Sequence, residues 1–310
     1  MLAGMSEAKT EPSGGTLSAV QGTAMYVGAV LGTGVIALPA LAAEAAGPAS
    51  LLAWLALVVL SAPLAAAFAA LGARYPDAGG VSTYAMKAFG ERASAVVGWC
   101  FYLAVPPGAA AAALFGGAYV SSAVGGGTTT TTVTAVGLMV VVTAANSLGL
   151  RVTGRFQFML AGLLVTLLLI AVALSLPKAD TANLEPFAPH GWSAVLPAAA
   201  LLVWSFAGWE AITHLAGEFK RPARDLPRAT YSAVVIVGGL YLLVAFAVIV
   251  VLGAKASESD APLGDLMAAG LGGDARYLAA GAALLLTTGA MNAYYAGAAN
   301  LGAALARDGA

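Results

Sequence analysis

The sequence predicts an all-α integral membrane protein, from its composition, from the length of its apolar segments and from their lack of strand patterning. Hydrophobic residues make up 60% of the 310-residue chain and charged residues only 9%, too few to cover the surface of a water-soluble domain. Apolar runs of about 20 residues, the length that crosses a hydrocarbon core, recur between short polar connectors. These runs lack the period-two alternation of a membrane β-barrel.

Eight membrane-spanning helices are expected, with one further segment interpreted as a loop. Residues 1–16 form a polar tail and residues 17–310 one transmembrane domain, because no connector is long enough to hold a soluble module. The Gly- and Thr-rich segment 125–132 is interpreted as a flexible loop. The expected spans lie at residues 17–43, 49–72, 94–123, 132–149, 155–176, 194–216, 230–253 and 276–304.

The basic residues predict an orientation in which the amino terminus is cytoplasmic and the chain lies in the inner membrane. Of the fourteen Lys and Arg residues, eleven then lie inside and three, Lys178, Lys255 and Arg276, lie outside. The net charge of -1 argues against nucleic acid as a partner, whereas lipid is an expected one and a homo-oligomer stays open. The single cysteine, Cys100, excludes a disulfide framework and is interpreted as core packing.

The first span contains three glycines, Gly28, Gly32 and Gly34, within seven residues at its middle. A helix can break at such a cluster, and the half-helix that begins near Val35 would then point its positive dipole end at the gap. A carboxylate would be held there, as in transporters with discontinuous helices. The alternative is that the glycines only allow close helix packing.

The sixth span places Glu210 inside an apolar run. An ionisable residue in the membrane is a functional candidate, and a carboxyl group suits proton coupling. The alternative is a structural pair with His214, one helical turn away. Around Gly208 the backbone can unwind to offer carbonyls and the Ser205 hydroxyl to an ammonium group, with Trp204 as a lid.

These two spans resemble the matching segments of the amino acid–polyamine–organocation permeases. The first motif is Gly32-Thr33-Gly34 followed by Val35, Leu38 and Pro39, and the second is the run Trp204 to Gly208 followed by Glu210. Segments 217–229 and 297–309 are similar to the family as well, so the likeness covers nearly the whole chain. The Val105-Pro106-Pro107-Gly108 step and residues 210–219 are most similar to bacterial exporters of methionine and branched-chain amino acids.

The resemblance implies a LeuT-like bundle of two inverted five-helix repeats with spans 1 and 6 broken, and transport of small neutral amino acids by alternating access. It implies that the glycines of span 1 bind the substrate carboxylate and that the backbone of residues 205–208 meets the amino group. Tyr294 can equally be a packing aromatic. Carried over by position, proton coupling or gating falls to Glu210 and His214, and substrate binding to Val30, Gly32, Thr33, Gly34, Trp204, Ser205, Phe206, Ala207, Gly208 and Tyr294.

Two departures from the family bear on coupling and completeness. Leu164 stands where some members carry a lysine that replaces sodium, and Ala290 where a hydroxyl would help bind sodium, so proton-coupled export or exchange is expected, without a cofactor or metal. The family usually has about twelve spans, and this chain ends after the eighth. One alternative is therefore a truncated product that does not transport. A second alternative is an uptake permease of the same fold.

Other classes are less well supported by the sequence. An enzyme is not expected, because the chain shows no HExxH motif, no carboxylate cluster for a metal and no phosphate loop. A channel or a structural membrane subunit can also contain kinked helices. Saturable and stereoselective substrate binding distinguishes a carrier from both.

Overall fold

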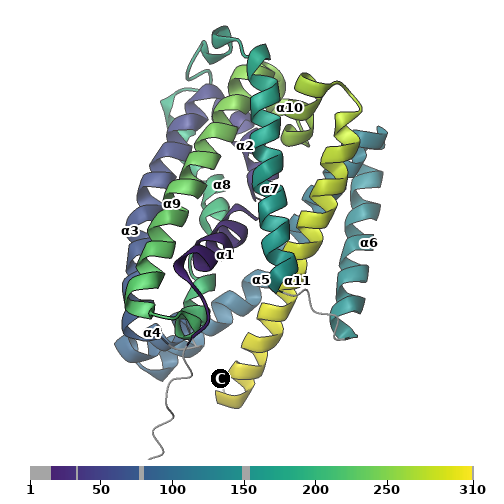
Figure 1. The fold of residues 1–310 in the computed structure, drawn as a ribbon. Helices are drawn as coiled ribbons and strands as arrows, with labels where there is room; N and C mark the ends of the chain where they lie inside the picture. Colours follow the sequence, from purple (N-terminus) through teal and green to yellow (C-terminus); the bar gives the residue numbers. More distant parts are fainter. Residues whose placement is uncertain (1–14, 33, 77–79, 149–153, 309–310) are drawn as a thin grey trace, which may run out of the picture.

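The computed structural model describes residues 15–32, 34–76, 80–148 and 154–308, and these segments fold almost entirely into helices (Figure 1). Helices suit apolar surroundings, because they satisfy the backbone hydrogen-bonding groups within one segment. Within the described residues, five helical segments are long and apolar enough to cross a membrane, namely Gly34–Arg74, Glu91–Val124, Gly127–Ser147, Phe158–Lys178 and Pro222–Glu258.

Up to residue 178, the described residues contain seven α-helices in sequence. Short 3-10 turns, η1 (Gly47–Ala49) and η2 (Leu176–Lys178), follow the second and the seventh. The helices are α1 (Ala19–Leu31), α2 (Gly34–Ala46), α3 (Ser50–Arg74), α4 (Val81–Phe89), α5 (Glu91–Val124), α6 (Gly127–Ser147) and α7 (Gly154–Ser175).

The described residues after 178 begin with 3-10 turns and contain four further α-helices. The sixth span is only partly α-helical, because α8 continues into two 3-10 segments with an extended residue between them. Its elements are η3 (Thr181–Leu184), η4 (Trp192–Ala194), α8 (Val195–Leu202), η5 (Val203–Phe206), η6 (Ala211–Glu218), α9 (Pro222–Ala247), the π-helical turn η7 (Val248–Leu252), η8 (Gly253–Glu258), α10 (Pro262–Leu271) and α11 (Ala275–Asp308).

The predicted all-α fold is confirmed, and the segment 125–132 corrects one expectation. The loop prediction there is wrong for most of the segment, because α6 already begins at Gly127. The threonines that follow are helical, and the Thr131 hydroxyl donates to the Gly127 carbonyl at 3.4 Å. Only a tight turn separates the two helices, since Gly125 ends α5 in the left-handed conformation with φ of 74°.

The long helices form two groups that meet along α7. In one group α3 and α1 pack against α9, and in the other α6 and α11 pack against α5, while α7 contacts both α1 and α11 (Figure 1). Large apolar side chains cover the outside, and Val235 and Leu196 are 74% and 75% exposed. Such a surface suits lipid contact.

The two ends of the bundle carry different small elements. Helix α10 lies at one end and α4 at the other, where α11 also ends (Figure 1). At the α4 end the segment before α1 pairs with the end of η6. The Leu17 amide donates to the Glu218 carbonyl and the Lys220 amide to the Leu17 carbonyl, both at 2.9 Å. This pairing covers Phe219, which is 1% exposed.

Candidate functional site

The first span is interrupted between α1 and α2. Helix α1 ends at Leu31, and Gly32 follows with φ of 37° and ψ of -145°, a conformation that glycine adopts without steric cost. Thr33 lies outside the described residues. Helix α2 then restarts at Gly34, so its first-turn amides have no partner within the helix and its positive dipole end faces the break.

The sixth span is interrupted after η5. Ala207 is extended, with φ of -68° and ψ of 138°, and Gly208 has a φ of 124° that side-chain-bearing residues rarely adopt. The 3-10 segment η6 begins three residues later at Ala211. The breaks expected in spans 1 and 6 are therefore both present in the fold.

The two breaks lie against each other. A Cβ atom on Gly208 would stand 2.9 Å from the carbonyl oxygen of Ala29 and 3.2 Å from the Cα of Val30. A Cβ atom on Gly34 would stand 3.2 Å from the Oγ of Ser205. Each break therefore places a glycine in close contact with the backbone or a small side chain of the other.

Tyr241 of α9, which sequence reasoning missed, joins the two breaks. Its hydroxyl lies 2.7 Å from the carbonyl oxygen of Val30 and 2.6 Å from that of Ser205, and the residue is fully buried. A phenol carries one proton, so it donates fully to only one of the two carbonyls at a time. The other carbonyl keeps acceptor capacity that a bound ammonium group can use.

The Glu210 carboxylate folds back onto the break of its own span. Both of its oxygens accept from the Gly208 amide, at 2.9 Å and 3.1 Å. The carboxylate thus stabilises an amide that helix unwinding leaves without a carbonyl partner. The side chain of His214, the other coupling candidate, lies outside the described residues.

Ser205 has an unused hydroxyl at the same place. Ser205 is 1% exposed, and its Oγ has no hydrogen-bond partner among the described residues. It faces the first residue of α2, as the Gly34 distance shows. A buried polar group without a partner is costly, and a ligand carboxylate at the α2 end would give this hydroxyl an acceptor.

Aromatic side chains surround the breaks. Phe206 packs edge-on against Tyr241, with ring centroids 5.2 Å apart. Trp209 is buried and packs against Tyr26, with centroids 5.7 Å apart. Tyr294 of α11 is partly buried and packs instead in a separate apolar cluster formed by residues of α5, α6 and α11.

Trp204 sits on the proline step of α5. It is partly buried, and a Cβ atom on Gly108 would stand 2.7 Å from the Cη2 of its indole. Gly108 directly follows Pro106 and Pro107 within α5. The Trp204 indole, the side chain that we expected to act as a lid, therefore occupies space that is open because Gly108 of α5 has no side chain.

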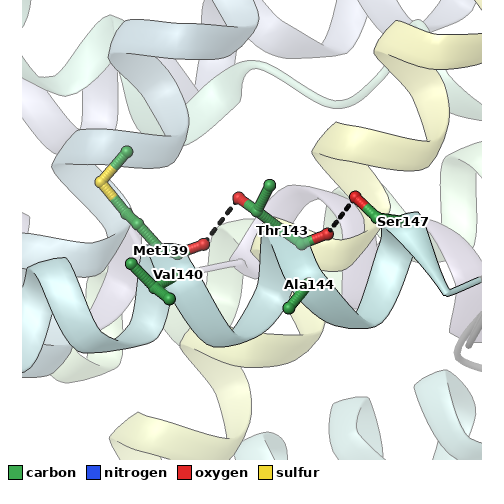
Figure 2. A pocket seen from close by; sticks show the side chains of 5 residues that line it. All are labelled: Met139, Val140, Thr143, Ala144 and Ser147. Atoms are coloured by element: carbon green, nitrogen blue, oxygen red, sulfur yellow. Dashed lines mark hydrogen bonds between the residues drawn. The ribbon is translucent and has the colours of Figure 1, made fainter.

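A separate hollow on the α6 surface does not offer comparable chemistry (Figure 2). The Thr143 hydroxyl donates to the Met139 carbonyl at 2.7 Å and the Ser147 hydroxyl to the Thr143 carbonyl at 2.9 Å. Since both hydroxyls are used within their own helix, the hollow presents mainly apolar surface. Its lining residues are Met139, Val140, Thr143, Ala144 and Ser147.

The fold and the paired breaks define a multi-pass helical membrane protein with interrupted first and sixth spans. The chain belongs to the amino acid permease family, whose family model matches residues 17–310. The family expected from the motifs is thereby confirmed. Members of this family are transporters and not enzymes.

Two bacterial relatives illustrate the likeness. The chain is 35% identical over 290 residues to the uncharacterized amino acid permease YecA of Bacillus subtilis (strain 168), which covers 94% of this chain and 68% of that protein. It is 33% identical over 232 residues to the L-methionine/branched-chain amino acid exporter YjeH of Escherichia coli (strain K12), over 73% of this chain and 54% of the relative. The chain thus spans between about half and two thirds of the length of these relatives.

A third relative broadens the range of substrates within the family. The gamma-aminobutyric acid permease of Escherichia coli (strain K12) is 28% identical over 253 residues, which cover 76% of this chain and 53% of that protein. Relatives of similar sequence thus carry names that differ in substrate.

Proposed function

We propose that this protein is a secondary active transporter of small neutral amino acids that works by alternating access at the two breaks. The observation that carries the proposal is that donors and acceptors for both ends of an amino acid meet where the breaks touch. The first-turn amides of α2 and the Ser205 hydroxyl suit a carboxylate. The carbonyls of Val30 and Ser205 suit an ammonium group.

The surroundings of the breaks favour an apolar side chain on the substrate. Trp204 and Phe206 provide aromatic surface, and Glu210 already accepts from the Gly208 amide instead of being free to pair with a cationic substrate. The likeness to an exporter of L-methionine and branched-chain amino acids supports the same choice. We expect methionine, leucine, isoleucine and valine to bind more tightly than lysine or glutamate.

Glu210 is the residue that we expect to couple transport to protons. A carboxylate accepts an amide hydrogen bond more strongly than a neutral carboxyl group does, so protonation of Glu210 would loosen the turn at Gly208. Sodium is disfavoured, since Leu164 is an apolar side chain with 2% exposure and Ala290 has no oxygen ligand. Proton-driven export or exchange therefore fits the site better than sodium symport.

The proposed setting is the inner membrane, with the amino terminus in the cytoplasm. The eleven basic residues on that side against three on the other support this orientation. Under this orientation the α4 end of the bundle faces the cytoplasm and the α10 end faces outward.

Transport by the purified protein in liposomes tests the proposal. The protein should exchange internal for external radiolabelled leucine or methionine with saturable, L-selective kinetics, and an imposed pH gradient should drive net flux. Glu210→Gln should keep exchange but lose the response to the pH gradient. Glu218→Gln, on the exposed end of η6, is the matched control and should respond as wild type does.

Two results would contradict the proposal. Absence of saturable binding of any neutral amino acid would reject the transport function. An unaltered pH response in Glu210→Gln would reject the coupling role while leaving transport intact. Net flux measured with the gradient in each direction decides between export and uptake.

A further inference from the structure

Tyr119 of α5 makes a two-sided hydrogen bond in the interior of the bundle. Its hydroxyl donates to the carbonyl oxygen of Ile36, and it accepts from the backbone amide of Leu263 at 3.1 Å. The direction of both bonds is fixed, because a carbonyl can only accept and an amide N–H can only donate. Tyr119 itself is 1% exposed, so water does not compete for either bond.

The two partners belong to elements with different roles. Ile36 is the third residue of α2 and lies in the turn whose free amides face the break. Leu263 is the second residue of α10, and its amide is one of the donors that a helix start leaves without an internal partner. One hydroxyl therefore connects the proposed carboxylate site to the small helix at the end of the bundle.

Helix α10 is held at that end by a second set of contacts that does not involve α2. Asp265 forms an ion pair with Arg276 of α11, at 2.8 Å between Oδ1 and Nη2, and its other oxygen accepts from the Ser259 hydroxyl at 2.6 Å. The apolar face of α10 is buried, and Leu266 and Met267 are at most 1% exposed. Helix α10 thus closes this end of the bundle over α2, α7 and α11.

We propose that Tyr119 is a positioning residue that couples occupancy of the substrate site to the position of α10. We call α10 seated when it packs on the end of the bundle as in this structure, and unseated when it has moved away. This inference rests on the proposed function and names how the site would control one end of the bundle. When a carboxylate binds the first turn of α2, the Ile36 carbonyl and the Tyr119 hydroxyl hold their places, and α10 stays seated through the Leu263 amide. When α2 shifts, the hydroxyl moves with it and α10 is released.

Removal of the hydroxyl has a definite consequence. In Tyr119→Phe the Leu263 amide stays buried without an acceptor while α10 is seated, but it reaches water when α10 moves away. A buried unsatisfied donor shifts such an equilibrium by about 5-fold to 150-fold. The shift favours the unseated position, whether or not substrate is bound.

Labelling of a cysteine on α10 measures this equilibrium. The reporter is Met267→Cys in the full protein with Cys100→Ala, since Met267 is buried when α10 is seated and Cys100 is the single native cysteine. The rate of reaction with a membrane-impermeant maleimide is measured in proteoliposomes with and without L-leucine or L-methionine. Binding of the same amino acids is measured separately on detergent-solubilised protein.

The variants separate seating from coupling. In the reporter protein, substrate should slow the labelling several-fold. Tyr119→Phe should label faster by about 5-fold or more and should lose the substrate effect. Asp265→Asn weakens the seat of α10 without touching α2, so it should also label faster but keep the substrate effect. Tyr119→Met also lacks the hydroxyl, so the test can still be made if Tyr119→Phe fails to fold.

Each outcome decides one of the two claims. A substrate effect that persists in Tyr119→Phe and Tyr119→Met, or that is lost equally in Asp265→Asn, overturns the coupling role of Tyr119. The coupling role is also overturned if the reporter protein binds substrate but its labelling rate does not change when substrate is added. A reporter protein that binds no neutral amino acid instead rejects the proposed function, and the separate binding measurement identifies that case.

Discussion

Gly208→Ala is the substitution that tests most directly whether the two broken spans touch as described. It adds one methyl group at a position where φ is 124° and where the new Cβ would lie 2.9 Å from the Ala29 carbonyl oxygen. The obstacle is backbone and cannot rotate away as a flexible side chain can. The substitution must therefore change the local conformation, separate the spans, or both.

Two contributions set the size of the effect. A residue with a side chain held in such a sparsely populated conformation costs about 1 to 3 kcal/mol. Forcing an extra carbon into a packed contact costs about another 1 to 3 kcal/mol. Together they amount to roughly 2 to 6 kcal/mol, which is a large part of the stability of an ordinary domain. We therefore expect loss of the contact between spans 1 and 6.

Thermal unfolding in detergent and binding of radiolabelled leucine measure the two consequences. Gly208→Ala should unfold several degrees below wild type and should bind leucine weakly or not at all. Gly239→Ala is the matched control, because no atom lies within 4 Å of its added methyl group in α9. The control should be neutral or gain about 0.5 to 1 kcal/mol of helix stability.

The reasoning fails if Gly208→Ala unfolds at the wild-type temperature and binds leucine with wild-type affinity. That result would mean that spans 1 and 6 do not approach each other at Gly208. A lower unfolding temperature with normal binding would show that the contact is structural and lies away from the site.

Two further substitutions test the surroundings of the breaks. Tyr241→Phe removes the hydroxyl that lies between the Val30 and Ser205 carbonyls. It should lower the free energy of unfolding by about 1 to 3 kcal/mol and weaken substrate binding. Wild-type values for both would show that this hydroxyl is dispensable. Gly108→Ala should push the Trp204 indole toward the breaks and lower the affinity for leucine more than for alanine. Adding Trp204→Phe to Gly108→Ala should restore the affinity for leucine, and a double variant no better than the single one would contradict the contact.

The breaks were predictable because they depend on local sequence. Glycine clusters and a carboxyl group in the middle of apolar runs conflict with a continuous membrane helix, and the structure resolves that conflict by interrupting spans 1 and 6. The partner of the carboxyl group was harder to predict. Helical spacing suggested His214, whose side chain lies outside the described residues, while unwinding freed the amide of Gly208, which lies only two residues from Glu210 and donates to its carboxylate.

The start of α6 shows why composition misled at residues 125–132. Threonine has a low intrinsic helix propensity in water, and a Gly- and Thr-rich run is typical of a loop there. In an apolar environment the backbone must satisfy its own hydrogen bonds, and the threonine hydroxyls can bond back to the preceding turn. The environment therefore outweighs the propensity at this end of the helix.

The buried tyrosines could not be predicted from sequence, because their partners are distant in the chain. Tyr119 bonds to residues 83 and 144 positions away, and Tyr241 to one 211 positions away. Nothing in the neighbouring residues distinguishes either tyrosine from an ordinary packing aromatic. Only the folded arrangement shows that each hydroxyl joins separate elements.

The alternating access proposed above would require that each end of the bundle be released while the other stays closed, and the fold holds its two ends by different means. At the α10 end, a side-chain hydroxyl and an ion pair hold the small helix. At the α4 end, two backbone hydrogen bonds of Leu17 and the ring of Phe219, which fills the space beside Gly22, hold the segment before α1. The segment held at the α4 end leads directly into α1, whereas α2 is linked to α10 through the Tyr119 hydroxyl. Under the proposed mechanism, a shift of α1 relative to α2 at Gly32 would release one end without disturbing the other, and the break in span 1 would serve both this movement and the proposed substrate binding.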